Sequence, residues 1–303
     1  MNVIETRELS RTFGRRAAVV SLDLEVRAGE IYGFLGPNGA GKTTTIRMLT
    51  GILPPSGGTA RIVGYDIRTD PGAVRARIGL LPESTGYYGW MTPVEYLGFF
   101  AQLYGIRPTE TTPRILTLLE WVGLSERRAG RIATFSRGMR APLGVARALI
   151  NRPRVVFLDE PMLGLDPLGQ RDVLELIRRE NRDEGTTMFL SSHALTQVGQ
   201  LCTRVGILDE GRLVAGTASK LSQRLKLPAA LRLTVTDPAR AQQAVAHLGP
   251  SHLVVVPRDQ ALPAEVLVRA LDRAGVIVRD VTVDTPNLED VLFALVWHKR
   301  DTR

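Results

Sequence analysis

The chain carries the stretch Gly36-Pro37-Asn38-Gly39-Ala40-Gly41-Lys42-Thr43, which satisfies the pattern G-x-x-x-x-G-K-[ST] at every required position. Residues 31–35 before it form a short apolar run that predicts a buried strand, and residues 44–50 after it predict a helix that stops at Gly51. The glycines therefore fall between a strand and a helix N-terminus. Unpaired N–H groups and a partial positive charge favour a phosphate there.

A phosphate-binding loop of this kind assigns roles to its own residues. Its glycines let the backbone curve around phosphate oxygens without a Cβ in the way. We expect Lys42 to reach the β- and γ-phosphates of a nucleotide and the Thr43 hydroxyl to hold Mg²⁺.

A second apolar run ends in two carboxylates. Residues 155–158 predict a central parallel strand, buried on both faces, and Asp159 and Glu160 follow it. Ligands of such sheets bind beyond the carboxyl ends of the strands, so both acids are expected at the same edge as the phosphate loop. Residues 186–190 predict another buried strand. It leads into His193, which we expect to have a functional role at the same edge.

The order of the remaining patterns indicates a sheet domain with an insertion. Residues 3–9 and 21–26 predict an antiparallel entry, joined by a basic turn that contains Phe13. Phe13 could stack on a nucleotide base or plug the edge of the core. Helical spacing between about residues 84 and 150 predicts a helical subdomain inserted between two halves of the sheet domain. Helices are expected there at 93–104 and 113–122.

Length and composition fit two domains. The chain has 303 residues, of which 44% are hydrophobic, and its pattern changes after about residue 218. Residues 219–303 read as β-α-β-α-β-α without a glycine-rich loop or an acid cluster. This second part is expected to be a small α+β domain with a regulatory or interaction role.

Charge and hydropathy restrict the cellular location and the class of partner that we expect. No run approaches the roughly 18 apolar residues that a transmembrane helix needs, and the charged start lacks an apolar signal region. We therefore expect a cytoplasmic chain. The net charge of +8 comes mainly from arginines spread along the sequence, which does not indicate a dedicated nucleic-acid site. Since Cys202 is the one cysteine, the chain forms no internal disulfide.

Taken together, the motifs of residues 1–218 resemble the ATP-binding subunit of an ABC transporter. Residues 36–43 match the Walker A loop, and residues 155–160 match Walker B with its catalytic glutamate. The likeness also covers Phe13 as the base-stacking aromatic and His193 as the switch histidine. Residues 164–166 resemble the D-loop, and residues 135–140 stand where the family carries its L-S-G-G-Q signature.

Several residues depart from the family pattern. The signature keeps Ser136 and Gly138 but has Arg137 and Met139 where glycine and glutamine are usual, and Glu83 replaces the glutamine of the Q-loop. Ala141-Pro142-Leu143 follows the signature, and a proline is expected to be tolerated there only in the first helical turn. The Leu-Pro-Glu and Ser-x-Gly-Met patterns are similar to the drug- and antibiotic-exporting branch that has ABC-2-type membrane partners.

The resemblance implies an α/β fold. It comprises a P-loop NTPase core with an antiparallel β subdomain, an inserted helical subdomain (about 84–150) and a small C-terminal α+β domain. The implied catalytic residues are Lys42, Glu160 and His193, and the implied Mg²⁺ ligands are Thr43, Asp159 and Glu83. The residues implied in ATP binding, including those supplied across a dimer, are Phe13, Gly36, Pro37, Asn38, Gly39, Ala40, Gly41, Lys42, Thr43, Thr44, Glu83, Ser136, Gly138 and Asp166.

Three functions are then compatible with the sequence. The first is an ATP-hydrolysing subunit of a membrane exporter, paired head-to-tail as a homodimer and held at the cytoplasmic face of the membrane by separate transmembrane subunits. In that dimer Arg137 would face the partner's nucleotide or stay solvated. The second is a soluble ABC-type ATPase acting on ribosomes or DNA, and the third is a non-catalytic nucleotide-binding regulator. The sequence leaves the cargo open.

Overall fold

The computed structural model describes residues 1–84, 86–192, 201–216, 230–235, 240, 255–257 and 264–284. The chain divides into two compact units, Met1–Gly216 and Thr217–Arg303, and each is described here by itself. Within the described ranges, every helix is too short or too polar to cross a bilayer.

An antiparallel sheet forms the first layer of the first unit. Its strands follow the order β2 (Arg16–Arg27), β1 (Asn2–Phe13), β4 (Gly57–Ile62) and β5 (Tyr65–Asp66). Alternate residues of β2 are buried, as expected for a sheet with one solvated face. The predicted antiparallel entry is confirmed, but both strands are longer than the apolar pattern suggests. The turn between them shrinks to Gly14 and Arg15.

A second sheet, mostly parallel, carries the phosphate loop. Its strand order is β10 (Arg212–Gly216), β9 (Arg204–Asp209), β3 (Ile31–Leu35), β8 (Thr187–Ser192), β7 (Val155–Asp159) and β6 (Ile78–Leu81). All pairs are parallel except β9 with β10, which form an antiparallel hairpin. Every residue of β3, β7 and β8 is buried, which explains their uninterrupted apolar runs.

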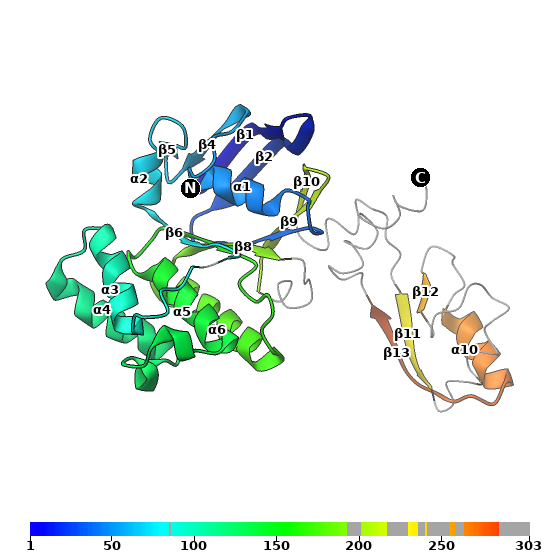
Figure 1. Cartoon of the computed structure of the whole chain (residues 1–303). Helices are drawn as coiled ribbons and strands as arrows, with labels where there is room; N and C mark the ends of the chain where they lie inside the picture. The colour runs from blue at the N-terminus through cyan, green and yellow to red at the C-terminus, as the bar shows by residue number, and fades with distance from the viewer. Residues whose placement is uncertain are drawn as a thin grey trace. The chain divides into compact units, whose positions relative to one another are not determined.

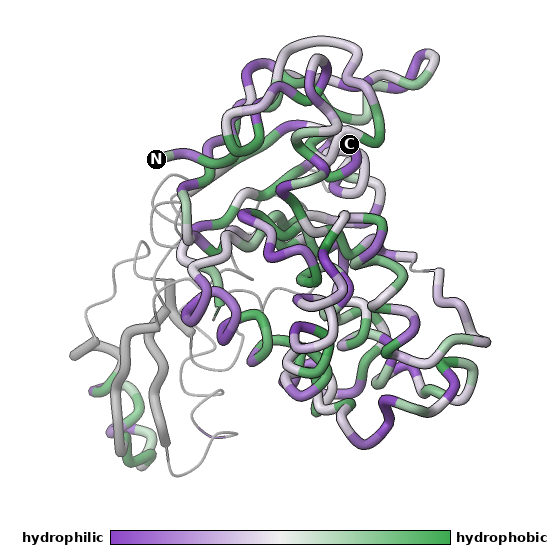
Figure 2. The backbone as a smooth tube through the Cα atoms, turned by 90° about the vertical axis from the view of Figure 1, so that its left-hand side faces the viewer, coloured by the Kyte–Doolittle hydropathy of each residue, from purple (hydrophilic) through white to green (hydrophobic). Residues whose placement is uncertain are grey.

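Helix α1 (Lys42–Leu49) lies between the two sheets, as Figure 1 shows. Its buried side chains join those of the antiparallel sheet and one face of the parallel sheet in a single hydrophobic cluster. Figure 2 shows hydrophobic and hydrophilic stretches interspersed along the chain of this unit. Because this core fixes α1 against β3, it also fixes the loop between them.

The helical subdomain is inserted between the neighbouring strands β6 and β7, as predicted. It contains α3 (Pro93–Leu103), α4 (Pro108–Trp121) and α5 (Arg137–Leu149), with short 3₁₀ turns at Ser125–Arg127 and Ile132–Thr134. Thr92 and Glu95 form a capping box that starts α3. Two further helices flank the insertion in sequence, α2 (Pro71–Arg75) before it and α6 (Pro167–Glu184) after it.

Two prolines lie inside these helices. The pattern predicted a helix starting at Pro113, but α4 begins at Pro108 and continues through Pro113. Pro142 lies inside α5, beyond its first turn, so the expectation that a proline is tolerated only in the first turn is wrong. It removes the helical hydrogen bond to the Gly138 carbonyl, a cost that the buried face of α5 offsets.

In the second unit, the described residues form a small α+β arrangement. An antiparallel sheet has the order β12 (Val255–Pro257), β11 (Ala230–Val235) and β13 (Val278–Asp284), and α10 (Ala264–Arg273) precedes β13. These elements match the predicted strands and one predicted helix. Apart from Arg240, the first and last helices of the predicted β-α-β-α-β-α order, expected at residues 239–248 and 288–297, lie outside the described residues.

Candidate active site

The carboxyl ends of three parallel strands meet at one edge of the second sheet. Leu35 at the end of β3 pairs with Ser192, and Asp159 at the end of β7 pairs with Ser191, so β8 stands between them. The phosphate loop continues from β3 and Glu160 follows β7. The fold therefore places the loop and the two carboxylates at the same edge, as the strand pattern predicts.

Two glycines make the curvature of the phosphate loop possible. Gly36 has φ +156°, and a Cβ built on it would lie 2.3 Å from the Leu208 carbonyl oxygen. Gly41, which precedes α1, has φ +108°, and its Cβ would lie 2.3 Å from the Ala18 carbonyl oxygen. The loop is thus pressed against β9 on one side and β2 on the other, and only glycine fits at both contacts.

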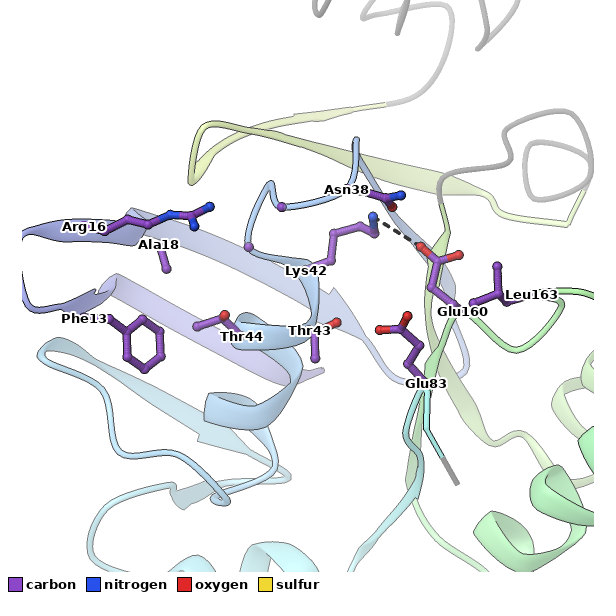
Figure 3. Close-up of a pocket in the computed structure, with 12 residues that line it drawn as sticks. Phe13, Arg16, Ala18, Asn38, Lys42, Thr43, Thr44, Glu83, Glu160 and Leu163 are labelled. Atoms are coloured by element: carbon purple, nitrogen blue, oxygen red, sulfur yellow. Dashed lines mark ion pairs between the residues drawn. The ribbon is translucent and has the colours of Figure 1, made fainter. Parts of the chain in front are cut away.

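Lys42 connects the loop to the catalytic carboxylate expected at position 160. Its Nζ donates to the carbonyl oxygens of Gly36 and Pro37 at 2.7 and 3.3 Å. The same nitrogen lies 3.2 Å from Oε1 of Glu160, and both side chains are at least nine-tenths buried. Figure 3 shows this ion pair at the centre of the cleft. A phosphate entering between them would meet a cation that is already oriented by the loop.

Ser191 fixes the two carboxylate residues relative to each other. Its hydroxyl donates to Oδ1 of Asp159 at 2.6 Å and accepts from the backbone N–H of Glu160 at 3.0 Å. Glu160 has φ +51°, a left-handed conformation that costs a non-glycine residue on the order of 1 kcal/mol or more. The hydrogen bond to Ser191 helps to hold this strained backbone.

These elements enclose a cleft of about 630 Å³ in the first unit. Phe13 stands at its wall with 47% of its surface exposed, so ring area is free to stack on a base. The Arg11 guanidinium lies 4.6 Å from the centre of that ring. The cleft is lined by Phe13, Arg16, Ala18, Asn38, Gly39, Gly41, Lys42, Thr43, Thr44, Glu83, Glu160 and Leu163.

Some residues expected in ATP binding do not line the cleft but lie buried next to it or contact residues that line it. The carbonyls of Gly36 and Pro37 face Lys42, and Ala40 is buried. Asp159 is buried too, where it accepts from Ser191.

Three other expected residues do not line this cleft. Ser136 caps α5, its Oγ accepting from Met139 N–H at 3.3 Å, and Gly138 follows in the first turn. Asp166 caps α6, its Oδ1 accepting from Gly169 N–H at 2.8 Å. His193 lies outside the described residues.

A smaller cavity of about 270 Å³ adjoins the cleft at Glu83 and Glu160. Asp159 and the signature residues Arg137 and Arg140 also line it. The Arg137 guanidinium lies against Gly164, since a Cβ built on that glycine would be 2.4 Å from Nη1. Within this chain, Arg137 therefore contacts the D-loop segment.

Sequence reasoning missed two residues that shape the site. Ser191 was read only as part of the segment ending in His193, because its contact with Asp159 depends on strand pairing. Arg16 was placed in a turn, whereas it begins β2 directly opposite Phe13. A two-residue turn at Gly14 and Arg15 would pair Phe13 with Arg16 and direct both side chains to the same face of the sheet. That pattern is the signal that could have assigned Arg16 to the cleft.

Comparison with known proteins agrees with this geometry. Residues 19–163 match the family model described as ABC transporter. The daunorubicin/doxorubicin resistance ATP-binding protein DrrA of Streptomyces peucetius is 36% identical over 99% of this chain and 94% of its own length. The chain belongs to the ATP-binding subunits of ABC transporters.

Further ABC relatives support the assignment. The bacitracin transport ATP-binding protein BcrA of Bacillus licheniformis is 40% identical over 70% of this chain and 68% of its own. A solved structure of an ATP-binding subunit of an ABC transporter has a TM-score of 0.68 and 31% identity, covering 74% of this chain and 93% of that one. The resemblance to the drug- and antibiotic-resistance branch and the P-loop NTPase fold are confirmed.

Membership of the family settles the class of activity. The chain is an ATP-hydrolysing subunit of an ABC transporter, and ATP is its ligand. The relatives found are transporter subunits, which removes the support for an ATPase acting on ribosomes or DNA. Family membership also counts against the non-catalytic regulator.

Proposed function

We propose that this subunit powers export of a drug- or antibiotic-like compound at the cytoplasmic face of a membrane, as a homodimer bound to separate transmembrane subunits. The observation that carries the proposal is the cleft in which the phosphate loop, Lys42, Glu160 and Phe13 converge. DrrA is named as a resistance protein and BcrA as a transport protein, and these names support both export as the direction of transport and the proposed class of cargo.

The proposed dimer follows from residues that the cleft of one chain does not contain. Ser136 and Asp166 cap helices α5 and α6 and Gly138 lies in the first turn of α5, and none of the three lines the cleft. In a head-to-tail pair, these segments of one subunit would complete the ATP site of the other, giving a closed assembly with two equivalent sites.

The cleft residues would act mainly by positioning and charge stabilisation, as phosphoryl transfer requires. Lys42 would leave its partner Glu160 to bind the β- and γ-phosphates, and Thr44 would bind the α-phosphate. Glu160 would then orient and polarise the attacking water, for which it needs only hydrogen-bond reach. The strained backbone of Glu160 keeps its carboxylate directed into the cleft. We propose that His193 senses the γ-phosphate.

The oxygen ligands available here suit Mg²⁺. No cluster of three or more acidic, histidine or cysteine side chains able to hold a metal occurs among the described residues, so the ion would depend on few protein ligands. Mg²⁺ commonly binds one or two protein oxygens together with waters and substrate phosphates. Thr43 and Asp159 are the proposed ligands, with Glu83 nearby. The bound ion would supply neutralisation of phosphate charge.

We propose residues 1–218 as the ATP-binding domain and 219–303 as an accessory domain. The division into compact units at Gly216 supports this boundary. The alignment with DrrA spans 99% of the chain and so extends into the accessory part, which supports a role shared with that relative.

The surface proposed to dock the transmembrane subunit lies on the helical subdomain. The Tyr88 ring lies tilted by 38° against that of Trp90, with centroids 5.2 Å apart, and also contacts Tyr96 and Phe99. Trp90 is 66% exposed, although tryptophan side chains bury well at interfaces. A rigid aromatic group with one open side is suited to hold a helix of a membrane partner.

Affinity capture from detergent-solubilised native membranes tests this proposal. The tagged wild-type chain is expected to retain a polytopic membrane protein in stoichiometric amount, identified by mass spectrometry. Trp90→Ala should reduce that recovery by roughly tenfold or more, since a buried aromatic anchor is commonly worth about 2 kcal/mol at an interface. Leu116→Ala, which removes another exposed apolar side chain of the same subdomain, is the matched control and should retain the partner.

Equal recovery with Trp90→Ala would exclude this docking surface. Capture of ribosomal or DNA-bound proteins without any membrane protein would overturn the exporter assignment itself.

A further inference from the structure

Arg16 lies directly opposite Phe13 in the β1–β2 hairpin. The two residues are paired in register on either side of the Gly14–Arg15 turn. Directly opposed residues of an antiparallel pair project from the same face, and Arg16 and Ala18 share that face because they are two positions apart. All three line the same cleft, so the hairpin directs Arg16 into the nucleotide site.

The guanidinium of Arg16 reaches the middle of the phosphate loop. A Cβ built on Gly39 would lie 3.7 Å from Nη2 of Arg16, so the guanidinium stands over the backbone of that glycine. Figure 3 shows the side chain extending from the hairpin toward the loop. The backbone N–H groups of such loops cradle the α- and β-phosphates, which places Arg16 at that part of the nucleotide.

The charge of Arg16 is available for a ligand. Arg16 is exposed, and its guanidinium takes part in no hydrogen bond or ion pair with another described residue. Arg11, in contrast, covers the Phe13 ring and donates to the Pro54 carbonyl oxygen at 2.7 Å. Lys42 is also engaged, with Glu160. Among these three cations, Arg16 alone can bind phosphate without first giving up a partner.

We propose that Arg16 is a nucleotide-binding residue that contacts the α- and β-phosphates across the phosphate loop. This inference rests on the proposed function in one respect, namely that the cleft around Lys42 holds ATP. Arginine suits the role because its planar guanidinium can donate two parallel hydrogen bonds to one phosphate group. Phe13 and Arg16 then act together, with the ring holding the base and the cation holding the phosphates next to it.

Because Arg16 lies over Gly39, its effect on nucleotide affinity should differ from that of Lys42. A cation at the α- and β-phosphates stabilises bound ADP as much as bound ATP. A cation that reaches the γ-phosphate favours ATP. Loss of Arg16 should therefore weaken both nucleotides equally and leave the ratio of their affinities unchanged.

Calorimetric titration of the full chain with Mg-ATP and with ADP tests the proposal. Arg16→Ala is expected to raise both dissociation constants by about tenfold, the size of a charge-assisted hydrogen bond at a partly exposed site. Arg16→Lys should recover only part of that loss, because lysine keeps the charge but not the paired donors. The matched control is Arg15→Ala, which removes the neighbouring arginine of the same turn. Arg15 does not line the cleft.

The other possible titration results would each contradict a different part of the proposal. Unchanged affinities in Arg16→Ala, or an equal loss in Arg15→Ala, would show that Arg16 makes no specific phosphate contact. A loss for ATP alone would move the contact away from the α- and β-phosphates. If the wild-type chain bound neither nucleotide, the proposed function would fail together with this inference, whereas wild-type binding with an unaffected Arg16→Ala would remove the inference alone.

Discussion

Replacing Glu160 with glutamine is expected to lower the rate of ATP hydrolysis by at least about a hundredfold while preserving ATP binding, since general-base assistance typically contributes 10²–10⁴-fold. Glutamine keeps the size of the side chain but cannot accept the proton of the attacking water. The substitution also removes the charge that pairs with Lys42 at 3.2 Å. Lys42 then becomes free for phosphate, so binding should not weaken.

Phosphate release and light scattering measure the two halves of this prediction. At saturating Mg-ATP, Glu160→Gln should accumulate as an ATP-bound dimer that the wild type passes through only transiently. Glu83→Gln is the matched control, because it neutralises a second carboxylate of the same cleft and restores the residue usual in the family. It should retain most of the hydrolysis. A monomeric Glu160→Gln under these conditions would contradict the head-to-tail arrangement.

Replacing Gly41 with alanine is expected to weaken nucleotide binding by roughly 5- to 150-fold, the range set by 1–3 kcal/mol of local strain. Its Cβ would lie 2.3 Å from the Ala18 carbonyl oxygen, and its φ of +108° is one that alanine rarely adopts. The loop must shift to relieve both problems, and the N–H groups at the start of α1 shift with it. Those groups are the ones expected to bind phosphate.

Nucleotide titration together with thermal unfolding separates a local change from a general loss of fold. Gly64→Ala is the control, since Gly64 has φ +83° but no atom within 4 Å of the added Cβ. It introduces comparable backbone strain without the clash and outside the cleft, so it should bind ATP normally. If Gly41→Ala also bound ATP normally, the close approach between the loop and β2 would not control binding.

The fold was largely predictable where burial is uniform. Strands β3 and β7 are buried along their whole length, so their apolar runs could be read without ambiguity. The glycine pattern between β3 and α1 then fixed the position of the site at the carboxyl edge of the sheet. A change from strand-like to helical spacing likewise revealed the insertion between β6 and β7.

Element ends were harder to predict because they depend on contacts distant in sequence. Strand β1 extends to Phe13 and β2 starts at Arg16 because the two pair with each other, although this segment is basic and contains a glycine. Helix α5 continues through Pro142 because this proline and most of the residues after it are buried against the sheet and neighbouring helices. Neither the pairing of β1 with β2 nor the burial of α5 can be predicted from the local helix and strand propensities of the residues.

The residues of the candidate site likewise divide into those that local sequence patterns predict and those that depend on contacts distant in sequence. Lys42, Thr43 and Glu160 belong to contiguous motifs and were found from spacing alone. Arg16 and Ser191 enter the site through strand pairing, and neither belongs to a motif. The roles assigned to Ser136, Gly138 and Asp166 remain predictions, because the cleft of one chain does not include them.

The contact between Arg137 and Gly164 links two segments that sequence comparison treats as separate motifs. The guanidinium occupies the space where any other residue at position 164 would carry its Cβ. Gly164 also has φ +70°, a left-handed conformation that favours glycine whatever space is available. This one glycine therefore provides both the backbone turn of its own segment and the space in which the Arg137 guanidinium lies.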